Sequence, residues 1–243
     1  MKYMGSKNRI AKEILPIILK DRKENQWYIE PFCGGCNMID KVNDNFCIAN
    51  DSNEYLIEMF IKLKLGWIPD KEISREMYME IKKNKDKYPK WLVGWTGFNC
   101  SYGGDWFKGY AGKTQTKKGI RDYQDEAFRN VMKQVKNISN INFTNFSYEK
   151  LDYPTKSIIY CDPPYENTTK YLQNKGFNHV KFWEWCRNMI IQGHTIFVSE
   201  YNAPKDFECV WKKEVKSSLS ANGKVGGNKV SIERLFVYGG ISE

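Results

Sequence analysis

Short apolar runs, each ending in a polar residue, a glycine or a proline, alternate along this chain with segments of helical periodicity. Runs of this kind are typical of buried strands, and they cover residues 27–29, 46–49, 141–143, 158–161, 195–198 and 235–238. The helical patterns run from the N-cap candidate Ser6 to about Ile18, over 53–64 and over 180–191, and Pro16 would kink or end the first. Strands that alternate with helices predict an α/β fold, in which helices cover a sheet.

One long segment, residues 65–140, interrupts this alternation. It is rich in Lys, contains several Trp, and centres on the glycine-aromatic stretch GWTGFNCSYGGDWFKGYAG. We predict that residues 1–64 and 141–243 form one divided domain. Residues 65–140 would then be an inserted second domain or a large excursion from the first.

The formal charge of +9 is concentrated in the middle of the chain. Residues 62–141 carry 17 basic and 9 acidic side chains, against 8 and 9 in residues 1–61 and 13 and 11 in residues 142–243. A polyanion gains salt-sensitive affinity from such a surface, because each Lys or Arg near a phosphate releases condensed counterions. The alternative is a basic surface that has no partner.

Several protein classes fit this sequence poorly. No apolar stretch approaches the roughly 18 residues of a membrane span, and the N-terminus lacks the apolar core of a signal peptide, so we expect a cytosolic protein. The seven cysteines are odd in number and several lie in apolar runs, which favours buried free thiols over a disulfide framework. Cys33 and Cys36 form a single CxxC, and neither His179 nor His194 has metal-ligand spacing, so we expect no metal site.

The strongest chemical signal is the sequence Asp-Pro-Pro-Tyr at 162–165, directly after the apolar run 158–161. Ligands of open α/β sheets bind at the carboxyl ends of strands. Two prolines fix two φ angles and remove two N–H donors, which leaves a stiff turn with carbonyl acceptors. The Asp162 carboxylate and the Pro163 carbonyl could accept hydrogen bonds from the two hydrogens of an aryl amine and aim its lone pair at a methyl donor. Tyr165 would stack on the aromatic base that carries this amine. The alternative is an ordinary proline-rich loop.

A second signal is the glycine-rich sequence at 30–36, which follows the strand predicted at 27–29. Glycines at a strand-to-helix turn let the backbone approach a cofactor closely. About 20 residues further on, Asn50-Asp51 supplies a carboxylate in position to bind ribose hydroxyls. An ordinary tight turn would explain the glycines alone, but the order of strand, glycines, strand and acid favours a cofactor site.

Together these motifs resemble those of the D12-class, or α-order, N6-adenine DNA methyltransferases. Residues 3–7 are similar to the family's N-terminal cofactor motif and 30–36 to its FxGxG motif. Asp51 corresponds to its ribose-binding acid, and 162–165 match its catalytic DPPY unchanged. The resemblance covers nearly the whole chain in the family's order. It implies a Rossmann-like α/β sheet of seven mixed strands, with a mainly helical target-recognition domain inserted at 65–140.

The resemblance also implies an activity, transfer of a methyl group from S-adenosylmethionine to N6 of an adenine flipped out of double-stranded DNA. The catalytic residues implied are Asp162, Pro163 and Tyr165. The cofactor-binding residues implied are Tyr3, Lys7, Pro31, Phe32, Gly34, Asp51, Ser147 and Asp162. From the charge distribution we add Lys113, Lys117 and Lys118 as DNA-binding residues, and we expect a monomer or a weak dimer.

Two residues depart from the family pattern. Cys36 stands where the last glycine of FxGxG is expected, and Ser147 stands where the family usually has an Asp that helps to bind the cofactor's adenine. Relatives that recognise GATC typically carry Arg-Tyr-Asn in the insertion, and this sequence does not.

Three other functions remain open. N4-cytosine methylation uses the same logic, although that group more often has Ser at the position of Asp162, and RNA adenine methylation can use a similar motif. A DNA-binding protein on an inactive methyltransferase fold is the third, and the intact Asp162 and Asp51 argue against it.

Residues 199–204 end a strand on the expected ligand face and either shape the base pocket or form a plain turn. Trp183 and Trp185 lie in a predicted helix, where we expect them to pack in the core or to be partly exposed rather than to stack on a base.

Overall fold

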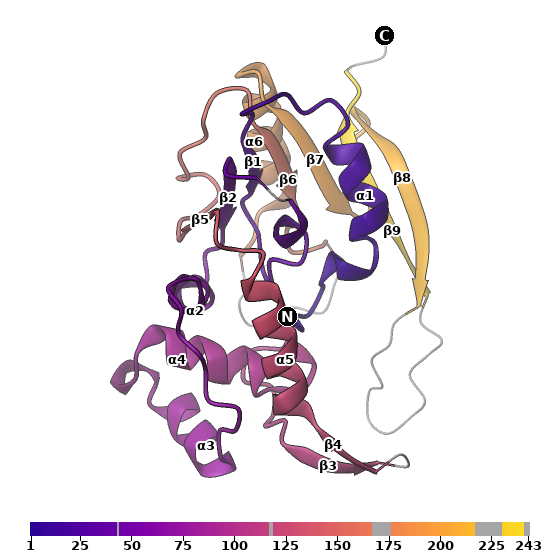
Figure 1. Ribbon diagram of the computed structural model, residues 1–243. Helices are drawn as coiled ribbons and strands as arrows, with labels where there is room; N and C mark the ends of the chain where they lie inside the picture. Colours follow the sequence, from indigo (N-terminus) through magenta and orange to yellow (C-terminus); the bar gives the residue numbers. More distant parts are fainter. Residues whose placement is uncertain (43, 117–118, 167–175, 217–229, 241–243) are drawn as a thin grey trace. The chain divides into compact units, whose positions relative to one another are not determined.

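The computed structural model describes residues 1–243 except 43, 117–118, 167–175, 217–229 and 241–243 (Figure 1). The described chain forms two compact units, each built from two separate stretches of sequence. Unit 1 consists of residues 1–11 and 33–148, and unit 2 consists of residues 12–32 and 149–243.

Unit 2 contains a mixed sheet with the strand order β1-β6-β7-β9-β8. The strands are β1 (Tyr28–Glu30), β6 (Ile158–Cys161), β7 (Thr195–Glu200), β8 (Phe207–Lys216) and β9 (Val230–Tyr238). β1, β6 and β7 run parallel, while β9 is antiparallel to both of its neighbours. Every residue of β1 and β6 is buried, as expected for parallel strands that are covered on both faces.

Helix α6 (His179–Ile191) lies between β6 and β7 in the sequence, as a parallel connection requires. Asn178 caps its N-terminus, because the Asn178 side chain accepts the N–H of Lys181 at 3.0 Å. The helix predicted from Ser6 to Ile18 is two elements, the 3-10 turn η1 (Lys7–Arg9) and helix α1 (Ala11–Ile18). Ser6 caps η1 rather than α1, and Pro16 lies inside α1 without ending it.

Unit 1 contains a pair of parallel strands, β2 (Cys47–Asn50) and β5 (Ile141–Thr144), and several helices. The longer helices are α2 (Glu54–Lys64), α3 (Arg75–Lys83), α4 (Lys90–Gly94) and α5 (Tyr123–Val135). Shorter turns are η2 (Ile39–Lys41), η3 (Lys85–Lys87), the π-helical η4 (Trp95–Asn99) and η5 (Tyr102–Gly104). An antiparallel hairpin of β3 (Lys113–Thr116) and β4 (Gly119–Asp122) leads directly into α5 (Figure 1).

The glycine-aromatic stretch of the middle segment forms a buried core within unit 1. Trp95, Tyr78 and Phe107 are all buried there. A side chain at Gly94 would collide with the backbone carbonyl of Tyr55 on α2, so the glycine allows α2 and α4 to pack closely. The aromatic residues of this stretch therefore stabilise the segment itself.

The predicted α/β class and all six predicted strands are confirmed, with bounds that shift by a few residues. The prediction missed β8, and it also missed the β3–β4 hairpin in a segment expected to be mainly helical. The division at 65–140 stays a prediction; that segment lies inside unit 1 together with neighbouring stretches on both sides.

The cysteines are free thiols, and all are buried except Cys209, which is exposed. No helix among the described residues is long and apolar enough to cross a membrane. Among the same residues, no group of three His, Cys, Asp or Glu side chains is placed to hold a metal ion.

Candidate active site

Residues 33–36, here called the glycine loop, follow β1 in the sequence and lie in unit 1. Gly34 has a φ of +46°, and a Cβ at this position would lie 2.6 Å from the ring of Tyr3. Only glycine fits, because the backbone is left-handed and the Tyr3 ring lies directly against it. The predicted cofactor residues Tyr3 and Gly34 are therefore in contact.

Cys36 also lies in the left-handed region, with a φ of +53°, and is fully buried. This conformation costs a residue with a Cβ roughly 1–2 kcal/mol relative to glycine. The structure thus gives a physical reason for the glycine that the family pattern has here. It also shows that a cysteine is accommodated at the same backbone conformation.

Asp51 follows β2 and holds the glycine loop through backbone hydrogen bonds. Its Oδ2 accepts the N–H of Gly34 at 3.0 Å, and its Oδ1 accepts the N–H of Asn53 at 2.9 Å. Burial raises the pKa of the Asp51 carboxyl above its usual range, while these two N–H groups oppose the shift. The carboxylate is held in one orientation, and each oxygen has a second lone pair that a ribose hydroxyl can use.

The segment that contains Ser147 is attached to the end of β2. The side chain of Asn50 binds both the N–H and the carbonyl of Phe146, each at 2.9 Å, and Asn145 donates to the Asp51 carbonyl at 2.7 Å. The Oγ of Ser147 is buried and has no hydrogen-bond partner among the described residues. An unpaired buried hydroxyl costs about 1–3 kcal/mol, and a hydrogen bond to a bound ligand is one way to recover this cost.

Lys7 is buried in η1, where its ammonium donates to the carbonyl of Gly5 at 3.0 Å. The predicted cofactor residues that belong to unit 1 are Tyr3, Lys7, Gly34, Asp51 and Ser147.

Gln134 on α5 is a further contact of the glycine loop that the sequence did not reveal. Its amide nitrogen donates to the carbonyls of Gly35 at 2.9 Å and Cys36 at 3.0 Å, and its side chain is buried. A single Gln on an amphipathic helix carries no sequence signal. The segment predicted to read DNA therefore also supports the glycine loop.

Residues 162–166, here called the catalytic turn after the role that the resemblance implies for them, follow β6 in unit 2. Pro163 is buried, and Tyr165 donates its hydroxyl hydrogen to Glu233 of β9 at 2.9 Å. The ring of Tyr165 meets that of Tyr201 edge-on, with 4.7 Å between centroids. Burial, with Asp162 and Glu233 nearby, raises the pKa of Tyr165 well above its ordinary value, so the phenol stays protonated.

Glu200, the last residue of β7, binds the other end of the catalytic turn. Its Oε2 accepts the N–H of Glu166 at 3.0 Å, and its Oε1 accepts the N–H of Tyr201 at 2.6 Å. Burial, assisted by the negative charges of Asp162 and Glu166, raises the pKa of Glu200 to about 7. The sequence left residues 199–204 open between pocket and turn, and it carried no signal for Glu233.

Pro31 and Phe32 also belong to unit 2. Pro31 is buried, and the Phe32 ring packs edge-on against Phe177 and Phe182, with 5.9 Å between centroids in both pairs. Phe32 thus belongs to an aromatic cluster at the start of α6.

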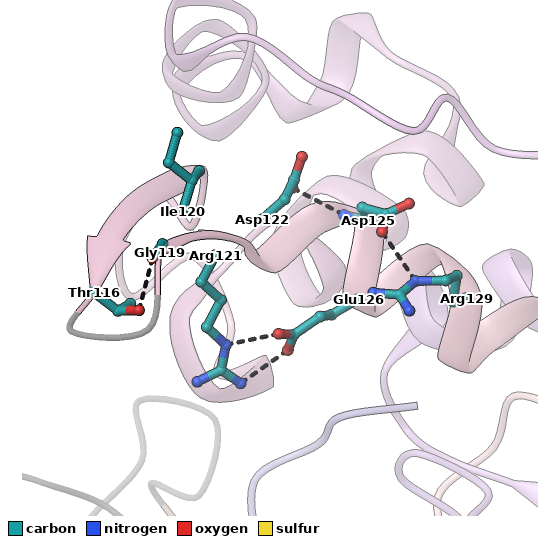
Figure 2. A pocket seen from close by; sticks show the side chains of 8 residues that line it. All are labelled: Thr116, Gly119, Ile120, Arg121, Asp122, Asp125, Glu126 and Arg129. Carbon is teal, nitrogen blue, oxygen red and sulfur yellow. Dashed lines mark hydrogen bonds and ion pairs between the residues drawn. The ribbon is translucent and has the colours of Figure 1, made fainter.

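Of the three predicted DNA-binding lysines, only Lys113 belongs to the described part of the chain. Lys113 is exposed on β3 and forms ion pairs with Glu72 at 3.0 Å and Asp122 at 4.0 Å, while Lys117 and Lys118 lie outside the described residues. Figure 2 shows the residues that line a pocket between the β3–β4 hairpin and the start of α5. Four of its five charged side chains pair with one another: Arg121 binds Glu126 at 2.7 and 2.9 Å, and Arg129 binds Asp125 at 2.9 Å. The fifth, Asp122, caps α5, and no residue of the predicted motifs lines the pocket.

The remaining residues singled out in the sequence have structural positions. His179 begins α6 rather than lying in a loop, and His194 is buried with its Nδ1 accepting the N–H of Ser157 at 3.2 Å. Trp183 is buried in α6, and Trp185 of the same helix packs on Phe182.

Comparison with known proteins identifies the family of this chain. The family model of the D12 class N6 adenine-specific DNA methyltransferases matches residues 3–92 and 95–202. The chain is 23% identical over 214 residues to the type II methyltransferase M.FokI of Planomicrobium okeanokoites, an alignment that covers 73% of this chain and 30% of that protein. The chain therefore spans less than a third of the length of this relative.

Among solved structures, the crystal structure of SMU.472 complexed with SAH is 10% identical, with a TM-score of 0.39. The match covers 98% of this chain and 55% of that one, but a likeness at this level is too weak to support a conclusion. The family match is different, because it extends over most of the chain and includes the glycine loop, Asp51 and the catalytic turn. This chain belongs to the family of D12 class N6 adenine-specific DNA methyltransferases.

Proposed function

We propose that this protein transfers a methyl group from S-adenosylmethionine to the N6 amino group of adenine in double-stranded DNA. The observation that carries the proposal is the unchanged Asp-Pro-Pro-Tyr sequence at the carboxyl end of the buried strand β6. The position is the one where α/β sheets bind ligands, and the family match supports the reaction class.

The residues of unit 1 fit the cofactor. Asp51 presents a carboxylate that suits ribose hydroxyls, and the unpaired Oγ of Ser147 offers a polar contact where relatives usually have an Asp. The buried ammonium of Lys7 suits the carboxylate of the cofactor's amino-acid group. When bound, S-adenosylmethionine supplies an electrophilic methyl group.

The catalytic turn acts on the amine of the target base. The lone pair of an aryl amine is delocalised into the ring, so the nitrogen is a poor nucleophile. The carboxylate of Asp162 and the carbonyl of Pro163 accept its two hydrogens and favour a pyramidal nitrogen with an available lone pair. Because the turn is already rigid, these acceptors need not reorganise during the reaction.

The target adenine has to leave the duplex to reach the catalytic turn, which costs a few kcal/mol. Tyr165 offsets part of this cost by stacking on the base. Its ring is held by the hydrogen bond to Glu233 and by the edge of Tyr201.

We further propose that Lys113, Lys117 and Lys118 bind the DNA backbone. Neutralising all three should weaken binding to any sequence and lower its dependence on salt. The ion pair of Lys113 with Glu72 competes with a phosphate for this ammonium, which should reduce the share of Lys113 in the loss. An unchanged salt slope would place the DNA on another surface.

The test is product analysis of DNA incubated with the protein and S-adenosylmethionine. We expect N6-methyladenine, and N4-methylcytosine as the sole product or methylation of RNA alone would overturn the proposal. Asp162→Ala should reduce turnover at least a hundredfold, equivalent to about 3 kcal/mol, with an unchanged circular dichroism spectrum. The exposed Asp152→Ala, in the same unit, should retain normal turnover and serves as the control.

A further inference from the structure

Glu200 joins the end of β7 to the residue that follows Tyr165. One carboxylate oxygen accepts the N–H of Tyr201 at 2.6 Å and the other accepts the N–H of Glu166 at 3.0 Å. The side chain is only 3% exposed, so the charged form is stable only while both N–H groups bind it. The contact therefore depends on the ionisation of Glu200.

The hydrogen bond from the N–H of Glu166 to Glu200 holds the C-terminal end of the catalytic turn. The first end is held by the sheet, because Cys161 pairs with Val198 in the β6–β7 ladder. The two prolines between the ends have fixed φ angles. With both ends held, the positions of Asp162 and Tyr165 are determined by the backbone rather than by the substrate.

We propose that Glu200 is a positioning residue of methyl transfer, whose ionised carboxylate holds the catalytic turn in its reactive geometry by binding the backbone of Glu166 and Tyr201. This role rests on the proposed function. A protonated carboxyl would direct an O–H toward a peptide N–H, lose one of the two hydrogen bonds and loosen the turn. The reactive geometry should therefore form as Glu200 loses its proton.

The surroundings of Glu200 raise its pKa, so that its carboxyl loses the proton near neutral pH. Asp162 and Glu166 of the catalytic turn oppose its ionisation, and burial opposes it most, so the pKa of Glu200 is raised to about 7. Arg234 lies opposite Glu200 in the ladder with β9, and its guanidinium donates to the carbonyl of Tyr201. Other titratable groups on the same strands and turn are the carboxyl of Glu233, the thiol of Cys161, and the phenols of Tyr160, Tyr165, Tyr201 and Tyr238. Tyr160 pairs with Ser199 at 2.8 Å and Tyr165 with Glu233 at 2.9 Å.

The test is the single-turnover rate of adenine methylation by the full chain at saturating DNA and S-adenosylmethionine, from pH 6 to pH 8. The wild-type rate should rise about tenfold over this range as Glu200 ionises, with a midpoint near pH 7. Glu200→Gln should be at least tenfold slower at pH 8 and lack this midpoint, with the Kd for S-adenosylmethionine within twofold of wild type. Glu200→Asp, which ionises but is one methylene shorter, should regain the pH dependence at a reduced rate. The exposed Glu214→Gln on β8 is the control and should behave as wild type.

A second measurement follows the contact without substrate. In protein labelled with 15N-Glu and 15N-Tyr, the amide resonances of Glu166 and Tyr201 should titrate with a midpoint near pH 7, and Glu200→Gln should abolish this titration. An active wild type together with an unaffected Glu200→Gln rate and pH profile would overturn the role of Glu200 alone. If Glu200→Gln weakened S-adenosylmethionine binding by the same factor as it lowered the rate, the proposal would also be overturned, because Glu200 would then be only structural. Absence of adenine methylation by the wild type, with normal amide titration, would instead overturn the proposed function.

Discussion

The glycine loop of unit 1 and the catalytic turn of unit 2 are held by the same kind of contact. In each, a carboxylate at the end of a buried strand accepts two backbone N–H groups, one from its own strand end and one from the motif. Asp51 binds Asn53 and Gly34, and Glu200 binds Tyr201 and Glu166. The two backbone segments that these carboxylates hold differ in conformation. The glycine loop contains left-handed residues, whereas the catalytic turn contains two consecutive prolines. A carboxylate can therefore hold a motif whatever the stiffness of the loop itself.

The surroundings of the two carboxylates differ. Asp51 is joined by the hydrogen bond from Asn145 to the segment that contains Ser147, whose buried Oγ has no hydrogen-bond partner among the described residues. Glu200 lies among Asp162 and Glu166, whose charges help to raise its pKa to about 7. The same hydrogen-bond arrangement should therefore serve binding in one unit and a pH-dependent rate in the other.

The largest effect should come from Asp51. Asp51→Ala removes the carboxylate that holds Gly34 and is proposed to bind the ribose, so we expect the Kd for S-adenosylhomocysteine to rise about a hundredfold, near the loss of one strong charge-assisted hydrogen bond. Isothermal titration calorimetry measures this directly. Glu200→Gln should leave the same Kd within twofold. Equal losses in the two variants would show that the carboxylates do not have separate tasks.

The next effect concerns the ring of Tyr165. Tyr165→Ala should slow single-turnover methylation about thirtyfold, because base stacking on an aromatic ring contributes roughly 1–3 kcal/mol. Tyr165→Phe loses only the hydrogen bond to Glu233 and should keep at least about a third of the rate, consistent with about 0.5 kcal/mol for that contact. If Ala and Phe are equally damaging, the hydroxyl matters and the stacking role is wrong. A 2-aminopurine at the target adenine should brighten on binding to wild type, which reports loss of stacking in the duplex.

A smaller effect is expected at Gln134. Gln134→Met keeps the volume but removes the donors to the carbonyls of Gly35 and Cys36, so we expect a Kd for S-adenosylhomocysteine about tenfold higher, near 1.4 kcal/mol. DNA affinity should be unchanged, although Gln134 lies in the segment predicted to read DNA. The exposed Gln192→Met is the matched control. Loss of DNA affinity without loss of cofactor affinity would contradict the role assigned to Gln134.

The smallest effect is on the pH dependence of stability, and it has opposite signs in the two units. The pKa of Glu200 is raised on folding to about 7, so its favourable contribution is present below its unfolded pKa and is lost as the pH rises through 7. The Tm of Glu200→Gln relative to wild type should therefore rise by a few degrees from pH 5 to pH 8.

Glu126 in unit 1 should show the reverse. Arg121, together with Lys2, lowers the pKa of Glu126 to about 2, so its contribution is present above the ordinary carboxyl pKa and is lost as the pH falls toward 2. The Tm deficit of Glu126→Gln should shrink on acidification from pH 5 to pH 3. Calorimetric scans of both variants measure these differences. Parallel pH dependence in the two variants would refute the assigned shifts.

Local features were predictable because their signals lie in adjacent residues. Apolar runs identified the strands that carry the motifs, and the prolines at 163–164 and the glycine at 34 marked the two turns. β8 was missed because apolar and charged residues mix along this edge strand, and the hairpin at 113–122 was missed because its strands are largely exposed and polar. In neither case does burial produce the apolar run or the alternation of apolar and polar residues from which a strand is predicted.

The sequence by itself determined the class of fold, the order of the motifs and the residue types that are proposed to do the chemistry. Only the tertiary structure decided which side chains hold them, because the partners are far apart along the chain. Gln134 lies 99 residues from Gly35, Glu233 lies 68 residues from Tyr165, and Glu200 lies 34 residues from Glu166. A pattern of neighbouring residues records helix and strand periodicity, but a hydrogen bond between distant segments depends on how the sheet and helices pack, and burial then sets the pKa of the groups that it joins.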